Sequence, residues 1–285
     1  MKKFVSVLLC CLMAFSLVAC GGAPAETPAE SDIVIDPAAF AEFTGPTIDA
    51  IKEAGVLTMA TEAQYAPFEF IDTKGNFVGC DIWLGKQIAA ALGVELKITD
   101  MAFDGIVPAI KAGQANLGIA AITFTADRAE EVDFSTPYIE SPQALVVAKG
   151  NEDVIKEIGD LAGKTVGAQR GTVQSELIKG VLTESNLFEL DKWPNVAMEV
   201  ASGKIDCLLV DAPAADNMIA GNDKLALANY TFSKDEMSAG EAVIMQKGNQ
   251  DLVDLVNAVI EAVAGDKGFD AAYDAAAALS KEMGL

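Results

Sequence analysis

The sequence predicts an α/β fold built on mostly parallel sheets. Short apolar segments of strand length alternate with amphipathic segments of helix length, and 51% of the 285 residues are hydrophobic. This alternation is typical of parallel sheets whose faces are covered by helices. The chain is longer than one hydrophobic core usually organises, so we expect two domains.

The pattern of alternating strands and helices begins after Ile48. Runs of consecutive apolar residues predict strands at 56–60, 95–99, 117–122, 164–168, 204–210 and 242–245. Segments with one apolar face predict helices at 81–92, 105–112, 172–181, 212–220 and 250–263. Gly93, Gly113, Gly203 and Gly265 stand just past helix ends, where a left-handed residue is favoured. Residues 68–79 alone predict a hairpin, with Lys74, Gly75 and Asn76 at its tip.

The first twenty residues predict a secretory signal rather than part of the fold. Lys2 and Lys3 precede the apolar run 4–19, which is shorter than the roughly 18 residues that a membrane-spanning helix needs. The run ends in LVAC followed by two glycines, which resembles the lipobox of bacterial lipoproteins. That resemblance implies that Cys20 is diacylated and anchors the mature chain to the membrane, since two acyl chains give stable attachment.

Residues 21–46 are rich in Ala, Pro, Glu and Thr and have little periodicity. This composition predicts a flexible tether between the anchor and the globular body. Within it, residues 36–43 are compatible with a helical turn.

The composition excludes several classes of function. The formal charge of −22 and the pI near 4.2 argue against a nucleic-acid partner, which requires clustered Lys and Arg. The chain has no histidine, which removes Ser-His and Cys-His catalysis and the commonest zinc ligand. We therefore expect no metal and no cofactor. Outside the leader only Cys80 and Cys207 remain, and both lie in apolar segments that predict buried free thiols.

A weak internal repeat indicates where a ligand would bind. Residues 109–123 and 199–213 each run from a helix through a glycine into a buried strand. Aligning Gly113 with Gly203 sets Ala121 opposite Asp211, each at the carboxyl end of its strand. Ligands of open α/β sheets bind beyond those ends, so two such units facing one another would form a cleft.

Polar and aromatic side chains gather at these predicted strand ends. Each also has an ordinary structural explanation: the aromatics as core residues, Thr172 and Asp211 as helix caps, Glu62 as a solvated loop charge. Together they match a free amino acid, whose carboxylate suits the planar fork of Arg128. Its ammonium would suit Asp211, aided by the Thr123 hydroxyl and the Ala121 carbonyl. The candidate residues are Glu62, Tyr65, Phe103, Ala121, Thr123, Arg128, Gln169, Thr172, Val173 and Asp211.

Five segments resemble the polar amino-acid-binding family of bacterial ABC-transporter solute-binding proteins. They are residues 61–70, 74–89, 101–138, 161–176 and 201–218, in the family's order and spacing. The resemblance covers Ile48 to the C-terminus. It implies a two-lobed periplasmic-binding-protein-like fold of type II, which closes on its ligand about two crossover strands at 144–149 and 241–246. Lobe 1 would comprise 47–141 plus 241–285 and lobe 2 would comprise 142–240.

The resemblance also implies roles for single residues. Arg128 would bind the ligand carboxylate and Asp211 its ammonium. Tyr65 and Phe103 would form aromatic walls, and Glu62 would face the ligand side chain. A monomer attached to the outer face of the cell membrane would deliver the amino acid to an ABC-transporter permease and would not be an enzyme.

The chain also departs from the family's pattern. Ala120-Ala121 stands where many binders of basic amino acids have two serines, and Cys80 replaces a phenylalanine. Arg170, the second of only two arginines, is expected at the mouth of the cleft and argues against a basic ligand, whereas Glu62 argues for one. The ligand therefore stays open between basic (Arg, Lys, His) and neutral polar (Gln, Cys) amino acids. The alternative is an enzyme resembling cyclohexadienyl dehydratases, with Glu62 or another cleft carboxylate as general acid.

Overall fold

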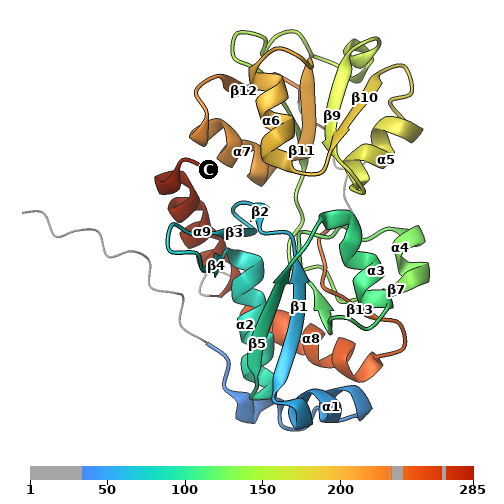
Figure 1. The fold of residues 1–285 in the computed structure, drawn as a ribbon, viewed down its shortest axis with the longest axis vertical. Coiled ribbons are helices and arrows are strands. Elements are labelled where there is room, and N and C mark those ends of the chain that lie inside the picture. The colour runs from blue at the N-terminus through green and yellow to red at the C-terminus, as the bar shows by residue number, and fades with distance from the viewer. Residues whose placement is uncertain (1–33, 231, 233–239, 265–267) are drawn as a thin grey trace, which may run out of the picture.

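Two α/β lobes, each built on its own five-stranded sheet, make up the fold (Figure 1). This computed structural model describes residues 34–230, 232, 240–264 and 268–285. The predicted signal at 1–20 with Cys20, the first part of the predicted tether and Gly265 lie outside the described residues. We call the lobe that contains β1 lobe 1 and the lobe that contains β9 lobe 2.

The sheet of lobe 1 has the order β5-β1-β6-β13-β7. Its strands are β1 (Val56–Thr61), β5 (Glu95–Asp100), β6 (Leu117–Gly118), β7 (Val132–Phe134) and β13 (Ile244–Gln246). The covering helices are α1 (Pro46–Ala54), α2 (Cys80–Leu92), α3 (Ile106–Lys111), α4 (Ala126–Glu131), α8 (Gln250–Val263) and α9 (Phe269–Met283). A short 3-10 helix, η2 (Phe103–Gly105), precedes α3.

The sheet of lobe 2 has the order β10-β9-β11-β8-β12. Its strands are β8 (Gln143–Ala148), β9 (Thr165–Gln169), β10 (Asn186–Leu190), β11 (Cys207–Asp211) and β12 (Leu225–Leu227). The helices are η3 (Ile158–Leu161), α5 (Val173–Gly180), α6 (Trp193–Ala201) and α7 (Ala212–Gly221). Every residue of β11 is buried, as expected for a central strand with helices on both faces.

Each sheet contains one strand that runs against its parallel neighbours. β1, β5 and β6 are parallel, as are β9, β10 and β11, whereas β13 and β8 are antiparallel to the strands beside them. These two strands follow the segments that pass between the lobes, so they enter their sheets from the opposite end. The sheets are therefore mixed, with one antiparallel strand in each, and this corrects the prediction of mostly parallel sheets.

The predicted crossover segments are largely strands within the sheets. Most of 144–149 belongs to β8 in lobe 2, and most of 241–246 lies in or beside β13 in lobe 1. The chain passes between the lobes just before each of them, and the two passages meet at an isolated antiparallel bridge between Ile139 and Glu241. The Ile139 carbonyl accepts the Glu241 N–H at 2.9 Å. We call residues 135–142 the connecting segment.

The strand predicted at 117–122 is shorter in the structure, where β6 ends at Gly118. Ile119 still donates its N–H to the Ala60 carbonyl, but Ala121 has a φ of 46°. The Ala121 N–H is given to the carboxylate of Asp81 instead of a neighbouring strand. A residue in a left-handed conformation cannot continue a strand, so the apolar run alone overestimates its length.

The predicted tether at 21–46 is partly docked on lobe 1. Ile35 and Phe40 are buried, and the Val34 N–H donates to the side-chain oxygen of Gln87 on α2. The expected helical turn is present as the 3-10 helix η1 (Pro37–Phe40). From Val34 onward this segment therefore belongs to the packed body, because its apolar side chains reach the core.

The predicted hairpin is present, with β3 (Glu69–Ile71) antiparallel to β4 (Phe77–Val78) and with β2 (Gln64–Tyr65) as a third strand beside β3.

Cys80 and Cys207 are buried free thiols, as predicted. Among the described residues, no helix has both the length and the apolar character needed to cross a membrane.

Candidate ligand-binding cleft

All the candidate residues from the sequence line a single cavity between the two lobes. The free space left between the side chains is about 10 Å³, roughly enough for one water molecule. An amino acid could enter only if the lobes separated. The cavity is lined by Glu62, Tyr65, Phe103, Ala121, Thr123, Arg128, Gln169, Thr172, Val173 and Asp211, together with Glu69, Ala120, Gln174 and Trp193.

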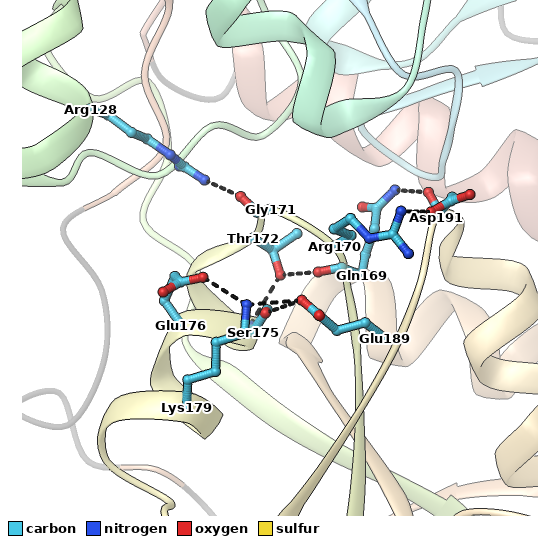
Figure 2. A network of polar contacts seen from close by, with 10 residues as sticks. All are labelled: Arg128, Gln169, Arg170, Gly171, Thr172, Ser175, Glu176, Lys179, Glu189 and Asp191. Carbon is cyan, nitrogen blue, oxygen red and sulfur yellow. Dashed lines mark hydrogen bonds and ion pairs between the residues drawn. The ribbon is translucent and has the colours of Figure 1, made fainter.

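Arg128 reaches across the cleft from lobe 1. Thr125 caps α4 by accepting the Arg128 N–H, which fixes the start of this short helix. The guanidinium donates to the Thr123 carbonyl at 2.7 Å and to the Gly171 carbonyl of lobe 2 at 3.0 Å (Figure 2). It also lies 5.6 Å from the centre of the Phe103 ring.

The charge of Arg128 has no carboxylate partner among the residues that the structure describes. Two acidic neighbours on the chain are paired elsewhere, Glu131 with Lys111 and Asp133 with Lys247. Burial lowers the pKa of Arg128 to about 10, which still leaves it charged at neutral pH. A half-buried guanidinium whose hydrogen bonds go only to carbonyls suits an incoming anion.

Asp211 faces the cavity from the end of β11. It precedes α7 but makes no side-chain capping bond, so the structural explanation of a helix cap does not account for it. Its carboxylate accepts the Tyr65 hydroxyl at 2.6 Å from the other lobe, and it also accepts the side-chain amides of Gln143 and Gln174. Burial raises the pKa of Asp211, and these hydrogen bonds oppose the shift.

Aromatic rings form one wall of the cavity. Tyr65 lies between Phe68 and Trp193, stacked on both, with ring centres at 5.4 and 5.6 Å. Trp193 begins α6 in lobe 2, so this stack joins the two lobes. Phe103 lines the cavity from η2 beside the guanidinium of Arg128.

Three buried acceptor atoms in the cavity have no hydrogen-bond partner. They are Oε2 of Glu62, Oε2 of Glu69 and Oε1 of Gln169, on side chains that are 3%, 1% and 1% exposed. Burial raises the pKa of Glu62 to about 8 and that of Glu69 well above its ordinary value. Such groups are costly to bury unsatisfied, so their concentration at one place points to a donor that belongs there.

The rest of the predicted lining consists of Thr172, Val173 and Thr123. The Thr172 hydroxyl donates to the Gln169 carbonyl at 2.7 Å and accepts the Ser175 N–H, which makes it the N-cap of α5 (Figure 2). Val173 is the first residue of that helix. Thr123 bridges to Glu241 next to the connecting segment.

Arg170 does not line the cavity. Its guanidinium binds Asp191 at 2.8 Å on the exposed surface, and Figure 2 shows it directed away from Arg128. The positive charge that the sequence placed at the mouth of the cleft is therefore already paired.

Sequence reasoning missed Glu69, Gln174 and Trp193 as lining residues. Glu69 interrupts an apolar hairpin strand, and a carboxylate at a position that alternation assigns to the interior is a usable signal. Trp193 and Gln174 carry no such signal, because they face the cavity only through the packing of α6 and α5.

Across the described ranges 34–230, 232, 240–264 and 268–285, no cluster of side chains has the makeup of a metal site.

Two lobes around a polar cleft, with facing residues from both, define a ligand-binding protein of the type II periplasmic-binding-protein fold. The chain belongs to the bacterial extracellular solute-binding proteins, family 3, which its residues 57–277 match.

Known proteins similar to this chain include binding proteins of transporters. It is 33% identical over 214 residues to the L-cystine-binding protein TcyJ of Escherichia coli, which covers 75% of this chain and 79% of TcyJ. The amino acid ABC transporter substrate-binding protein AbpA of Streptococcus pneumoniae, solved bound to L-arginine, superposes with a TM-score of 0.78 at 34% identity, covering 81% of this chain and 98% of AbpA. An ancestral amino acid-binding protein, AncCDT-1, described as a precursor of cyclohexadienyl dehydratase, gives 0.74 at 29% identity over 80% of this chain and 98% of its own.

Proposed function

We propose that this protein captures an L-amino acid with a cationic side chain, L-arginine first among them, and delivers it to an ABC-transporter permease. The general solute-binding role follows from the family, and the choice of ligand rests on the chemistry of the cleft. The observation that carries it is the placement of two buried carboxyl groups, Glu62 and Glu69, on the cavity beside Gln169, where Glu62 Oε2 and Gln169 Oε1 have no donor. A guanidinium with five N–H donors can satisfy several acceptors at once.

The invariant part of an amino acid fits the rest of the cavity. Its carboxylate would replace the carbonyls that Arg128 now contacts, and a two-oxygen anion matches the guanidinium fork better than single carbonyls do. Its ammonium would take the place of the Tyr65 hydroxyl on Asp211, with the Thr123 hydroxyl and the Ala121 carbonyl as further acceptors.

The pairing of Arg170 with Asp191 supports a basic ligand over a neutral one. From the sequence alone, Arg170 argued against a basic ligand and Glu62 argued for one. Because Arg170 is paired with Asp191, its charge no longer argues against a basic ligand. Two carboxyl groups, Glu62 and Glu69, then line the part of the cavity without a cation. The pKa values of both are raised by burial, and a cationic side chain would favour their charged form by pairing with them, which a neutral amide cannot do.

A thermal-shift screen of the twenty amino acids on the chain from Gly21 onward tests this function. Ligand at about 100-fold over its Kd adds roughly 2.7 kcal/mol of stability, which gives a readily measured rise in melting temperature. We expect arginine, and after it lysine, to raise the melting temperature most. A rise with glutamine or cystine and none with arginine would contradict the basic specificity but not the binding of amino acids.

The attachment of the protein to the membrane through a diacylated Cys20 is part of this proposal. It rests on the leader sequence and the lipobox-like LVAC. Mass spectrometry of the mature N-terminus should find acylated Cys20 as the first residue, and Cys20→Ser should release the protein into the medium. A mature chain that begins elsewhere would contradict the anchor. We propose that the anchored protein acts as a monomer.

The alternative of a cyclohexadienyl-dehydratase-like enzyme has one observation in its favour. A raised pKa of about 8 would keep Glu62 protonated at neutral pH, as a general acid requires. The similarity to AncCDT-1, whose descendants include that enzyme, points the same way. A fall in prephenate or arogenate absorbance on adding the protein would support the enzyme, whereas stoichiometric binding of arginine without turnover would support the receptor.

A further inference from the structure

The buried carboxylate of Asp81 joins the ligand cavity to the connecting segment. Asp81 lies in the first turn of α2 and is 0% exposed. One of its oxygens, Oδ2, accepts the Ala121 N–H at 2.8 Å and the Tyr138 hydroxyl at 2.9 Å. Ala121 lines the cavity and Tyr138 lies in the connecting segment. The Oδ2 atom of Asp81 therefore binds both the cavity lining, through Ala121, and the connecting segment between the lobes, through Tyr138.

Ala121 needs this contact because its conformation is unfavourable. Its φ of 46° is the only positive value recorded for a residue other than glycine in the described part of the chain. A left-handed conformation costs about 1–2 kcal/mol for a residue with a Cβ, so it persists only where the surroundings hold it. The hydrogen bond to Asp81 is such a restraint, and it holds the N–H of Ala121, the residue whose carbonyl we assign to the ligand ammonium.

Tyr138 is placed at the point where the two passages between the lobes meet. Its N–H donates to the Glu241 carbonyl at 2.9 Å, and its ring packs on Phe269 of α9 with ring centres 5.3 Å apart. The bridge between Ile139 and Glu241 lies one residue further on. When the lobes move relative to one another, the backbone of this region must change conformation. The hydrogen bond from the Tyr138 hydroxyl links such a change to Asp81.

The surroundings of Asp81 favour its charged form relative to its neighbour Glu69. Burial raises the pKa of Asp81 to about 6, while the hydrogen bonds from Ala121 and Tyr138 oppose the rise. The pKa of Glu69, also buried and next to Asp81, is raised well above its ordinary value. Near neutral pH the proton therefore resides on Glu69 and the charge on Asp81, where a negative charge also suits the N-terminus of α2.

We propose that Asp81 is a positioning residue that couples ligand binding to lobe closure. It holds Ala121 in the conformation that the ligand requires and holds Tyr138 in the connecting segment. This role rests on the proposed function, because it acts on the affinity for the same ligand. Asp81 itself does not line the cavity.

Calorimetric titration of L-arginine into the full mature chain in detergent tests the coupling. We expect Asp81→Ala to weaken binding by about tenfold or more, since one lost buried hydrogen bond is worth that much. Asp81→Asn keeps an oxygen acceptor and should lose less. Adding Ala121→Gly to Asp81→Ala should recover part of the loss, because glycine adopts positive φ without a restraint. Tyr138→Phe should weaken binding through the connecting segment alone.

Asp251→Ala is the matched control. Asp251 accepts two N–H groups of lobe 1, those of Thr47 and Ile48, but neither of these residues lines the cavity or belongs to the connecting segment. It should lower the melting temperature and leave the Kd unchanged. If Asp81→Ala likewise changed only the melting temperature, or if Ala121→Gly restored nothing in its background, Asp81 would have a purely structural role and the proposal would be wrong.

Hydrogen exchange without added ligand separates this inference from the proposed function. The peptide that contains Ala121 should exchange faster in Asp81→Ala and at the normal rate in Asp251→Ala. If wild type binds no basic amino acid while this exchange difference is found, the proposed function fails and the restraint on Ala121 stands. Equal exchange in the two variants would overturn the restraint whatever the ligand is.

Discussion

At the scale of single residues, the cleft contains polar groups with protein partners and polar groups without them. Arg128 and Asp211 each contact the opposite lobe, through the Gly171 carbonyl and the Tyr65 hydroxyl. Glu62 and Gln169 keep acceptor atoms without partners. The first pair would exchange their partners for the backbone groups of an amino acid, and the second pair would gain partners from its side chain.

The raised pKa of Glu62 predicts that binding of a cationic ligand depends on pH. Its pKa rises from 4.5 to about 8 chiefly because burial disfavours the charged form, so the neutral form dominates in the cleft below about 8. A cationic ligand favours the charged form and must displace the proton. Affinity for arginine should therefore rise as pH increases from about 5 to about 8 and level off above that.

Titrations in two buffers with different ionisation enthalpies measure this exchange. Arginine binding at pH 7 should release close to one proton in wild type and fewer in Glu62→Gln. The same proton release in both proteins would show that Glu62 is not the group involved.

The residue types at the cleft could be predicted from the sequence because each strand end is marked by a change from apolar to polar residues. Asp211 is the last residue of β11, and Tyr65 and Arg128 lie in the segments that follow β1 and β6. Glu69 was missed because it begins a hairpin strand instead of following the carboxyl end of one, and Trp193 because it starts a helix. The roles that we give to the ten candidate residues remain predictions, whereas their location around one cavity is a property of the structure.

At the scale of elements, most of the predicted strands and helices are present because burial imposes their periodicity. β1, β5, β9 and β11 and the helices α2 and α8 coincide with the apolar patterns to within a few residues. The segment 117–122 did not, because hydrophobicity cannot distinguish a strand from a buried turn held by Asp81. The crossovers predicted at 144–149 and 241–246 lie mostly within the sheets, because β8 and β13 pair there, and the chain passes between the lobes just before them.

The start of α2 depends on Gly79, which allows a test at this scale. Gly79 has a φ of 123°, and a Cβ there would lie 2.0 Å from the Phe68 carbonyl oxygen. Because that neighbour is backbone, the hairpin and α2 would have to move apart. We expect Gly79→Ala to destabilise the fold by more than about 3 kcal/mol, which a large fall in melting temperature would show.

Gly75→Ala serves as the comparison for this effect. Gly75 also has a positive φ, of 87°, but nothing lies within 4 Å of a Cβ at the hairpin tip. Its substitution should cost only the conformational strain, about 1–2 kcal/mol. Equal effects of the two substitutions would show that the contact with Phe68 does not matter.

At the scale of the whole molecule, α9 ties lobe 1 to lobe 2. It packs on lobe 1 through Phe269 and Tyr273, while its end contacts α7 of lobe 2 (Figure 1). The Asn217 amide donates to the Leu285 carbonyl at 2.8 Å and accepts the Ser280 hydroxyl at 2.6 Å. These contacts add to the connecting segments in favouring the closed arrangement.

Removal of this tie should weaken ligand binding from a distance. Asn217→Ala loses both hydrogen bonds, which lowers the population of the closed form and so raises the apparent Kd severalfold. Asn186→Ala is the control, because its amide binds the Gly163 carbonyl within lobe 2. Fluorescence of Trp193, which stacks on Tyr65 across the cleft, reports the closure in a Trp83→Phe background. An unchanged Kd in Asn217→Ala would mean that α9 does not contribute to closure.

The central claim is that the cleft binds a basic L-amino acid through the guanidinium fork of Arg128. Calorimetric titration of L-arginine into wild type and Arg128→Lys tests it most directly. We predict saturable one-to-one binding to wild type and a loss of affinity of about a hundredfold or more in Arg128→Lys, since a point charge cannot bind both carboxylate oxygens in a fixed orientation. Wild-type affinity in Arg128→Lys, or no binding of any basic amino acid to wild type, would contradict the account.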